Sequence, residues 1–239
     1  LVWLTSCASA PETSDVPSVT DVLSRAVSAH GMDGLDSSRM AFTFRDRDYT
    51  IEMDGGSFVY TRSFTDSLGR AVRDELTNDG LKRYRHDTLQ SLTPKDSAAY
   101  ASSVNSVRYF FLLPYGLYDP AVNAELLDTV EIRGQAYNQV RISFEEDGGG
   151  EDFDDVYRYF FSVENGELDF LAYTFEAEEG GIRFREAINK RRVNGVLIQD
   201  YINYGLDGDD REINNIAERY QEGELPELSR IENTSVRIE

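Results

Sequence analysis

The sequence predicts an α+β fold built mostly from antiparallel strands. Within residues 137–194, Val140, Ile142 and Phe144 alternate with polar residues, and this period of two is expected of a strand with one buried face. Three more aromatic or β-branched runs follow, each bounded by a glycine-rich or acidic turn: 153–163, 168–175 and 182–189. Because these runs leave almost no room for a helix, we expect an antiparallel meander.

A helix and a first meander are expected to precede it. Ser18 can accept a hydrogen bond from the first turn of a helix whose apolar residues recur at helical spacing as far as Val27, and Gly31 lies just past its end. Residues 40–92 then contain several short strand-like runs separated by turns such as Asp54-Gly-Gly. The helix has one apolar face, so it needs a sheet to cover it.

A second helix is expected between the two meanders. Thr93-Pro94 opens it. One apolar stripe runs along it at spacings of four, three and four residues: Tyr100, Val104, Val107 and Phe111. We expect a short additional helix to start at Asp119-Pro120 and the second meander to begin at 130–133.

Length and composition place these elements in one domain. The chain has 239 residues, and all-β domains often reach about 200 to 250 residues as one unit. Hydrophobic residues make up 40% of the sequence, which is enough for a sizeable core. We expect a single domain over 18–205, followed by an acidic C-terminal tail over 206–239 that forms a short helix near 213–220 and ends loosely ordered.

Charge and residue inventory argue against several functions. The formal net charge is −20, so nucleic acid, which is itself a polyanion, would be repelled. The sequence has two histidines, His30 and His86, and no G-x-S-x-G motif, so a Ser/His hydrolase has no visible nucleophile. We therefore expect a protein that is not an enzyme.

The first residues resemble the end of a bacterial lipoprotein signal. Leu1-Val-Trp-Leu-Thr-Ser-Cys7 has an apolar run, a leucine three residues before Cys7 and small residues between them. This resemblance implies that 1–6 are a truncated signal peptide, that Cys7 is the lipidated N-terminus and that 7–17 form a flexible tether. The expected location is the bacterial cell envelope, with the protein anchored at the periplasmic face of the outer membrane.

Three stretches look like those of an uncharacterised family of bacterial lipoproteins. They are SVNSVRYFFLLPYGLYDPAV at 103–122, GGGEDFDD at 148–155 and GGIRFREA at 180–187. The order of helix, meander, helices and meander also resembles the lipoprotein carriers LolA and LolB. This likeness implies an incomplete, half β-barrel of about 11 strands curled around a few helices, with an apolar cavity for acyl chains. The sequence contains no LolA or LolB motif, so transport itself does not carry over.

A ligand cavity is predicted beside the second meander. Residues 156–161 carry large apolar side chains on both strand faces, whereas a one-faced sheet needs one such set, so the extra set must lie under a helix, against a partner or along a ligand. The predicted lining and rim residues are Val104, Val107, Tyr109, Phe111, Tyr115, Tyr137, Tyr159, Arg183 and Arg185. Arg183 and Arg185 share one strand face, where they either receive a carboxylate or phosphate head group or pair with acids across the strands.

An acidic turn is a weaker candidate site. Its carboxylates offer the hard oxygen ligands that Ca²⁺ requires, although the spacing is not that of an EF-hand. The turn can equally be a solvated acidic hairpin. The residues concerned are Asp147, Glu151, Asp152, Asp154 and Asp155. No other cofactor is expected.

Three classes of function follow from these observations. The first is an anchored lipoprotein whose half-barrel binds a hydrophobic small molecule or lipid. The second is a structural or adaptor protein of the envelope whose sheet edges meet another protein. The third is an enzyme of unknown type. A continuous cavity separates the first class from the second, and convergent buried ionisable groups would favour the third.

Overall fold

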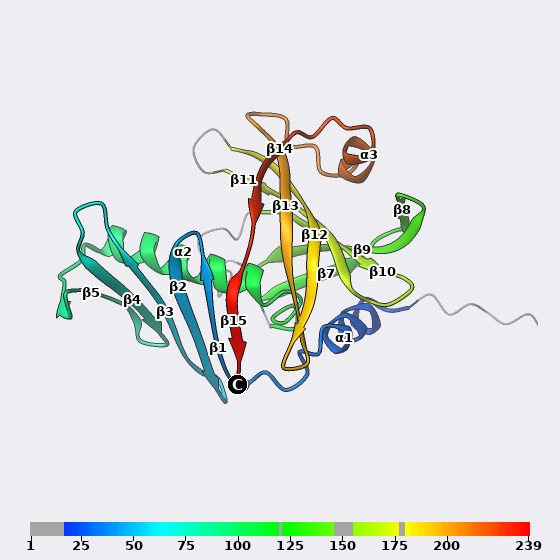
Figure 1. Cartoon of the computed structure of the whole chain (residues 1–239). Helices are drawn as coiled ribbons and strands as arrows, with labels where there is room; N and C mark the ends of the chain where they lie inside the picture. The colour runs from blue at the N-terminus through cyan, green and yellow to red at the C-terminus, as the bar shows by residue number, and fades with distance from the viewer. Residues whose placement is uncertain (1–16, 120, 146–154, 177–179) are drawn as a thin grey trace, which may run out of the picture.

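The computed structural model describes residues 17–119, 121–145, 155–176 and 180–239. In it the chain forms two antiparallel sheets that stand beside each other, and the long helix α2 runs behind the first of them in the view of Figure 1. The fold is therefore α+β and mostly antiparallel, as the sequence predicts.

Helix α1 spans Val19–Ala29 and begins where its sequence predicts. The Ser18 hydroxyl accepts a hydrogen bond from the backbone N–H of Asp21 (3.1 Å), and the Asp21 carboxylate accepts one from the N–H of Ser18 (3.0 Å). These two bonds satisfy donors that a helix leaves free at its start. The buried face of α1, which includes Leu23 and Ala26, packs against the second sheet.

The first sheet is a meander of consecutive strands, joined at one edge by a strand from the C-terminus. Its order is β15-β1-β2-β3-β4-β5-β6, and all pairs are antiparallel. Buried and more exposed side chains alternate along its strands, so one face is buried and the other meets solvent. The strands are β1 Ser37–Phe44, β2 Arg47–Asp54, β3 Ser57–Thr65, β4 Ala71–Thr77, β5 Gly80–Arg85, β6 Thr88–Leu89 and β15 Thr234–Ile238.

Helix α2, Pro94–Phe111, covers the buried face of the first sheet. Its N-cap is Thr93, whose side chain accepts a hydrogen bond from the N–H of Asp96 (3.1 Å). Val104 is buried in the core between this helix and the sheet. Within the described residues, no helix has the length and apolarity needed to cross a membrane.

A buried ionic cluster also ties α2 to the first sheet. Asp74 is 0% exposed and accepts hydrogen bonds from Arg62 (2.9 and 2.7 Å) and from Arg83 (2.5 and 2.9 Å). Arg62 also donates to the hydroxyl of Ser103 on α2 (2.7 Å), and Arg83 stacks on the ring of Tyr100 at 3.4 Å from its centre. Two guanidinium groups therefore share one carboxylate beneath the helix.

The second sheet continues the chain as a second meander. Its order is β14-β13-β12-β11-β10-β9-β7, with β8 paired to β9. The strands are β7 Val122–Leu126, β8 Val130–Ile132, β9 Gln135–Phe144, β10 Tyr157–Ser162, β11 Leu168–Phe175, β12 Gly181–Val193, β13 Val196–Asp207 and β14 Glu227–Ile231. The prediction of a short helix from Asp119 was wrong. The described residues there form successive turns, in which the N–H of Asp119 donates to the carbonyl of Gly116 (3.2 Å), and β7 begins at Val122.

Unlike the first sheet, the second sheet is buried on both faces along its central strands. All six residues of β10 are buried. Its inner face packs on α1 and on the end of α2, and its outer face packs under helix α3, Ile216–Gln221. The aromatic rings of Phe160 and Phe184 lie on this outer face together with Tyr220 of α3. The second apolar face that the sequence shows is thus covered by the chain itself.

The last residues are not the loose tail that the sequence predicts. The short helix expected near 213–220 is present as α3. Strand β14 pairs with β13 and strand β15 pairs with β1, so the folded domain extends well beyond residue 205. Strand pairing uses backbone groups, so this segment needs few apolar side chains to join the sheets. Across the described residues the chain has fifteen strands, more than the expected eleven or so.

These C-terminal strands join the two sheets. In Figure 1, β14 and β15 follow each other along the boundary between them. At the step from one strand to the next, the N–H of Asn233 donates to the buried carboxylate of Asp200 (2.9 Å), which also pairs with Arg191 (3.2 Å). The sheets together form an open, incomplete barrel, which confirms the predicted half-barrel.

Candidate ligand-binding site

Two cavities lie beside each other along α2, between the two sheets. Their volumes are about 520 and about 450 Å³. Both volumes fall within the range of about 300 to 1,000 Å³ typical of ligand pockets. Ser106, Phe110 and Tyr157 line both cavities and form a shared wall.

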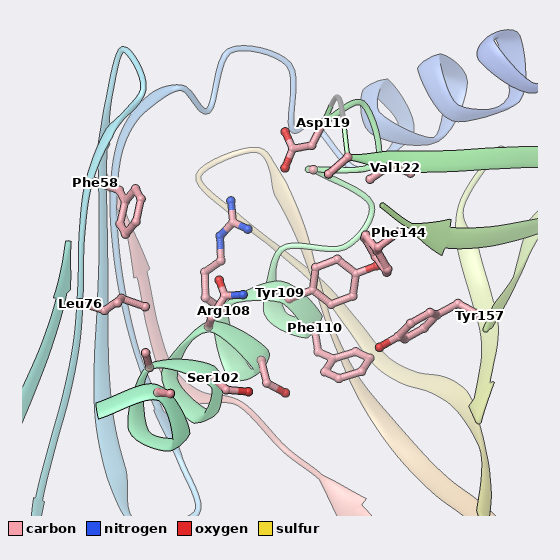
Figure 2. A pocket seen from close by; sticks show the side chains of 16 residues that line it. Phe58, Leu76, Ser102, Arg108, Tyr109, Phe110, Asp119, Val122, Phe144 and Tyr157 are labelled. Carbon is pink, nitrogen blue, oxygen red and sulfur yellow. The ribbon is translucent and has the colours of Figure 1, made fainter. Parts of the chain in front are cut away.

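The first cavity is bounded by α2 and by both sheets (Figure 2). Phe58 and Leu76 approach it from the first sheet, and Phe144 and Tyr157 approach it from the second. Its charged lining residues are Arg108 and Asp119. The lining charges of this cavity therefore balance.

The second cavity has an aromatic lining with an excess of positive charge. Phe44 lines it from the first sheet, Phe111 from α2, and Tyr173 and Tyr201 from the second sheet. Its charged lining residues are Arg45, Asp155, Arg183 and Arg185. Among the described residues, three arginines and one carboxylate thus line the same space in a protein whose formal net charge is −20.

Arg183 is neutralised beside this cavity. It pairs with Asp207 on the neighbouring strand β13 (2.7 Å) and donates to the carbonyl of Leu206 (3.2 Å). Its guanidinium carbon lies 4.4 Å from the centre of the Phe175 ring. Cross-strand pairing, one of the two predicted roles of the arginines, is therefore the role that the structure gives to Arg183.

Arg185 has a different environment. It is 9% exposed, and its guanidinium carbon lies 3.9 Å from the centre of the Phe110 ring and 5.1 Å from that of Tyr173. One terminal nitrogen donates to the Tyr173 hydroxyl (2.8 Å), while its Nε has no hydrogen-bond partner within the described chain. No carboxylate of the described residues forms an ion pair with it. Within the described part of the chain, its buried positive charge therefore faces the cavity without a matching anion.

Two hydrogen-bonded tyrosines lie at the wall of the first cavity. The hydroxyls of Tyr109 and Tyr159 share a hydrogen bond of 2.6 Å. Burial is the main cause that raises the pKa of both phenols above the ordinary value, so both are neutral at physiological pH. Tyr109 lines the cavity, and Tyr159 lies behind it, fully buried.

The structure brings most of the predicted binding residues to this region, but not all. Val107, Phe111, Arg183 and Arg185 line the second cavity and Tyr109 lines the first. Four predicted residues line neither cavity: Val104, Tyr115, Tyr137 and Tyr159. Val104 and Tyr115 pack in the core of the first sheet. Tyr137 lies in the core under α3, on the outer face of the second sheet, where its hydroxyl donates to Asp169 (3.0 Å).

Sequence reasoning missed several lining residues, including Phe58, Leu76, Ser106 and Phe110. Phe58 and Leu76 come from the first meander, and no local pattern shows that it faces the second. A signal did exist for Phe110, since it lies one residue from the predicted stripe and widens it. For Tyr137 the sequence argued against the prediction. Tyr137 is an odd number of residues from Val140 and Ile142, so its side chain points to the opposite face of the strand.

The predicted calcium turn lies almost entirely outside the described residues. Asp147, Glu151, Asp152 and Asp154 fall there, and Asp155 is described as a buried residue that lines the second cavity. Within the described ranges no three His, Cys, Asp or Glu side chains are grouped to hold a metal ion. Calcium binding stays a prediction, which thermal unfolding with calcium and with a chelator tests.

The two histidines lie apart from both cavities. His86 is exposed at the turn before β6. His30 is fully buried at the end of α1, where its Nδ1 lies 3.1 Å from the carbonyl oxygen of Ala26 and its Nε2 has no partner within the described chain. Burial lowers its pKa to about 4, so the ring is neutral.

The two sheets form an open half-barrel whose fold is similar to those of several solved structures. The solved structure of a LolA superfamily protein from Nitrosomonas europaea is similar, with a TM-score of 0.52 and 10% identity over 93% of this chain and 94% of that chain. A DUF1329 family protein from Desulfovibrio piger is similar too, with a TM-score of 0.52 and 9% identity over 92% of each chain. At these identities the likeness shows the fold alone.

The family itself follows from the sequence. The chain belongs to a family of unknown function, DUF6503, whose model matches residues 2–233. The comparison with curated proteins found no match.

Proposed function

We propose that this protein binds an elongated hydrophobic ligand, a lipid or a lipid-like small molecule, in the two cavities along α2. The observation that carries this proposal is the shared wall of Ser106, Phe110 and Tyr157, which places two largely apolar spaces beside each other. Apolar surface that a ligand covers there is removed from water at a gain of about 25 cal/mol per Å². The half-barrel fold supports the same reading.

A neutral fluorescent dye tests the proposal without depending on charge. Lipid-stripped protein is titrated with N-phenylnaphthylamine, whose emission rises when it enters an apolar site. We expect Ser106→Trp to weaken dye binding by roughly tenfold or more, because the indole fills space on both sides of the wall and overpacking costs about 1 to 3 kcal/mol. Ser106 suits this test better than Val104, which is 1% exposed in the core, where a larger side chain would disturb the fold.

The matched control is Ala99→Trp, a substitution at an exposed position of the same helix that lines neither cavity. It adds the same indole and should leave dye binding unchanged. If wild-type protein takes up neither the dye nor extracted envelope lipid, the ligand-binding proposal fails and the adaptor function takes its place.

The proposed location is the bacterial cell envelope, with the protein anchored by lipid at Cys7. The support is the lipobox resemblance of the first seven residues and the polar segment behind them. Cys7 lies outside the described residues. Changing Cys7→Ser in the full-length precursor should abolish lipidation and membrane fractionation. Unmodified wild-type protein found free in the periplasmic fraction would contradict the proposal.

A further inference from the structure

We infer that the ligand carries one acidic group, a carboxylate or a phosphate, and that this group binds Arg185 in the second cavity. The inference rests on the proposed function and adds polarity and direction to it. The acidic end lies in the second cavity, and the apolar part extends past Phe110 into the first.

The first reason is the cost of the unmatched charge on Arg185. A buried guanidinium without an anion is unfavourable, and buried polar groups without partners call for an explanation. Arg185 is 9% exposed, has one described side-chain hydrogen bond, to Tyr173, and leaves its Nε without a partner in the described chain. An acidic ligand would supply the missing counter-charge.

The second reason is the asymmetry between the cavities. Arg108 and Asp119 balance each other in the lining of the first cavity, whereas three arginines face one carboxylate in the second. Asp207 neutralises Arg183, and the described lining residues that remain, Arg45, Arg185 and Asp155, still have a net positive charge. In a protein with a net charge of −20, this excess marks the second cavity as the place where an anion is attracted.

The third reason is the preorganisation of the side chain. The guanidinium plane packs against the Phe110 and Tyr173 rings at 3.9 and 5.1 Å from their centres, so little side-chain entropy is lost when an anion binds. Phe110 also belongs to the shared wall. Phe110 therefore both holds the guanidinium of Arg185 in place and contacts the apolar part of the ligand where it extends into the first cavity.

A series of amphiphiles with one chain length tests this inference. Dodecanoic acid, dodecyl phosphate and dodecanol differ in the polar end alone, and each is titrated by calorimetry into lipid-stripped, full-length protein. We expect the two acidic compounds to bind roughly tenfold or more tightly than the alcohol, as a charge-assisted hydrogen bond would give. Arg185→Gln should remove this preference, so that the two acids bind this variant no more tightly than dodecanol does.

Two further variants separate the charge from its surroundings. Arg141→Gln is the matched control, since it removes an arginine from the outer face of the same sheet, paired there with Glu125 (3.1 Å), and should keep the preference. Arg185→Lys keeps the charge and loses the planar stack, so it should retain part of the preference. Thermal unfolding of the ligand-free protein checks whether Arg185→Gln folds. If it does not fold, Arg185→Lys replaces it as the test of the inference.

The outcomes separate the inference from the proposed function. Equal affinity for acid and alcohol, or a preference that survives in Arg185→Gln, overturns the acidic-group inference while hydrophobic binding stands. Failure of all three compounds overturns both. A final arm names the source of the acid: extraction of phosphatidic acid from phosphatidylcholine vesicles supports a lipid head group, and tight dodecanoate binding without extraction supports a free amphiphile.

Discussion

The two sheets are both antiparallel meanders, yet they are stabilised in different ways. The first sheet has one buried face, and a charged cluster around Asp74 lies between it and α2. The central strands of the second sheet are buried on both faces, and aliphatic and aromatic side chains fill its two cores. The number of sheet faces that other elements cover therefore determines which strand positions must be apolar. A sheet covered once can carry polar residues at every second position, and a sheet covered twice cannot.

The cavities lie where these two kinds of sheet meet. Phe58 and Leu76 of the first sheet face Phe144 and Tyr157 of the second across the first cavity (Figure 2). Neither sheet alone encloses this space. The ligand site therefore depends on how the two sheets are held together.

The largest effect is expected from removing the cover of the second sheet. A chain that ends at Asp207 lacks α3, β14 and β15, so the buried rings of Phe160 and Phe184 would meet water. We expect no cooperative unfolding transition in urea and strong binding of a hydrophobic dye. The control is Leu228→Ala, a change at an exposed residue of the same segment that should stay within about 0.5 kcal/mol of wild type. A truncated chain with a cooperative transition would contradict this prediction.

The next largest effect is expected in the first sheet. Asp74→Ala leaves Arg62 and Arg83 buried without their carboxylate, and breaking a buried pair in this way costs about 3 to 5 kcal/mol. Urea unfolding measures the loss. Asp54→Ala removes an exposed carboxylate from the same sheet and should change stability by less than about 0.5 kcal/mol. Equal stability of the two variants would show that the cluster does not hold α2.

A smaller effect concerns the buried histidine between α1 and the second sheet. The pKa of His30 is about 4 in the folded protein, chiefly because of burial, compared with 6.5 ordinarily. Between these values the unfolded chain binds the proton more readily, so stability falls as the pH drops from about 6.5 to about 4. The shift corresponds to roughly 3 kcal/mol. His30→Gln should lose this part of the pH dependence of urea unfolding, and His86→Gln, at an exposed site, should keep it. An unchanged pH profile in His30→Gln would contradict the burial argument.

The parts of the fold that sequence reasoning predicted are those with a local signal. Ser18 and Thr93 cap their helices as expected, since a cap is a contact between near neighbours. Strand β13 was missed because its first six residues are all buried and show no period of two. The C-terminal strands were missed because backbone pairing with distant strands holds them, and their side chains carry no apolar pattern.

The candidate site divides in the same way. Val107 and Phe111 were found because they belong to a stripe on a single helix. The difference between Arg183 and Arg185 was not visible, since it depends on Asp207 of one neighbouring strand and Tyr173 of the other. The pairing of the strands therefore determines which arginine is neutralised, and the sequence of β12 alone does not.

The strand pairing at the C-terminus has a consequence for the order of folding. Met40 on β1 pairs with Ile238 on β15, so the first sheet receives its edge from the far end of the chain. Contacts between residues so distant in sequence form late and slow folding, because closing a long loop costs entropy before the contact forms. During folding, each meander can assemble from its own hairpins. The strand that joins the two sheets pairs last. The cavities along α2 would then become a binding site at the end of folding, so ligand uptake would report that the chain is completely folded.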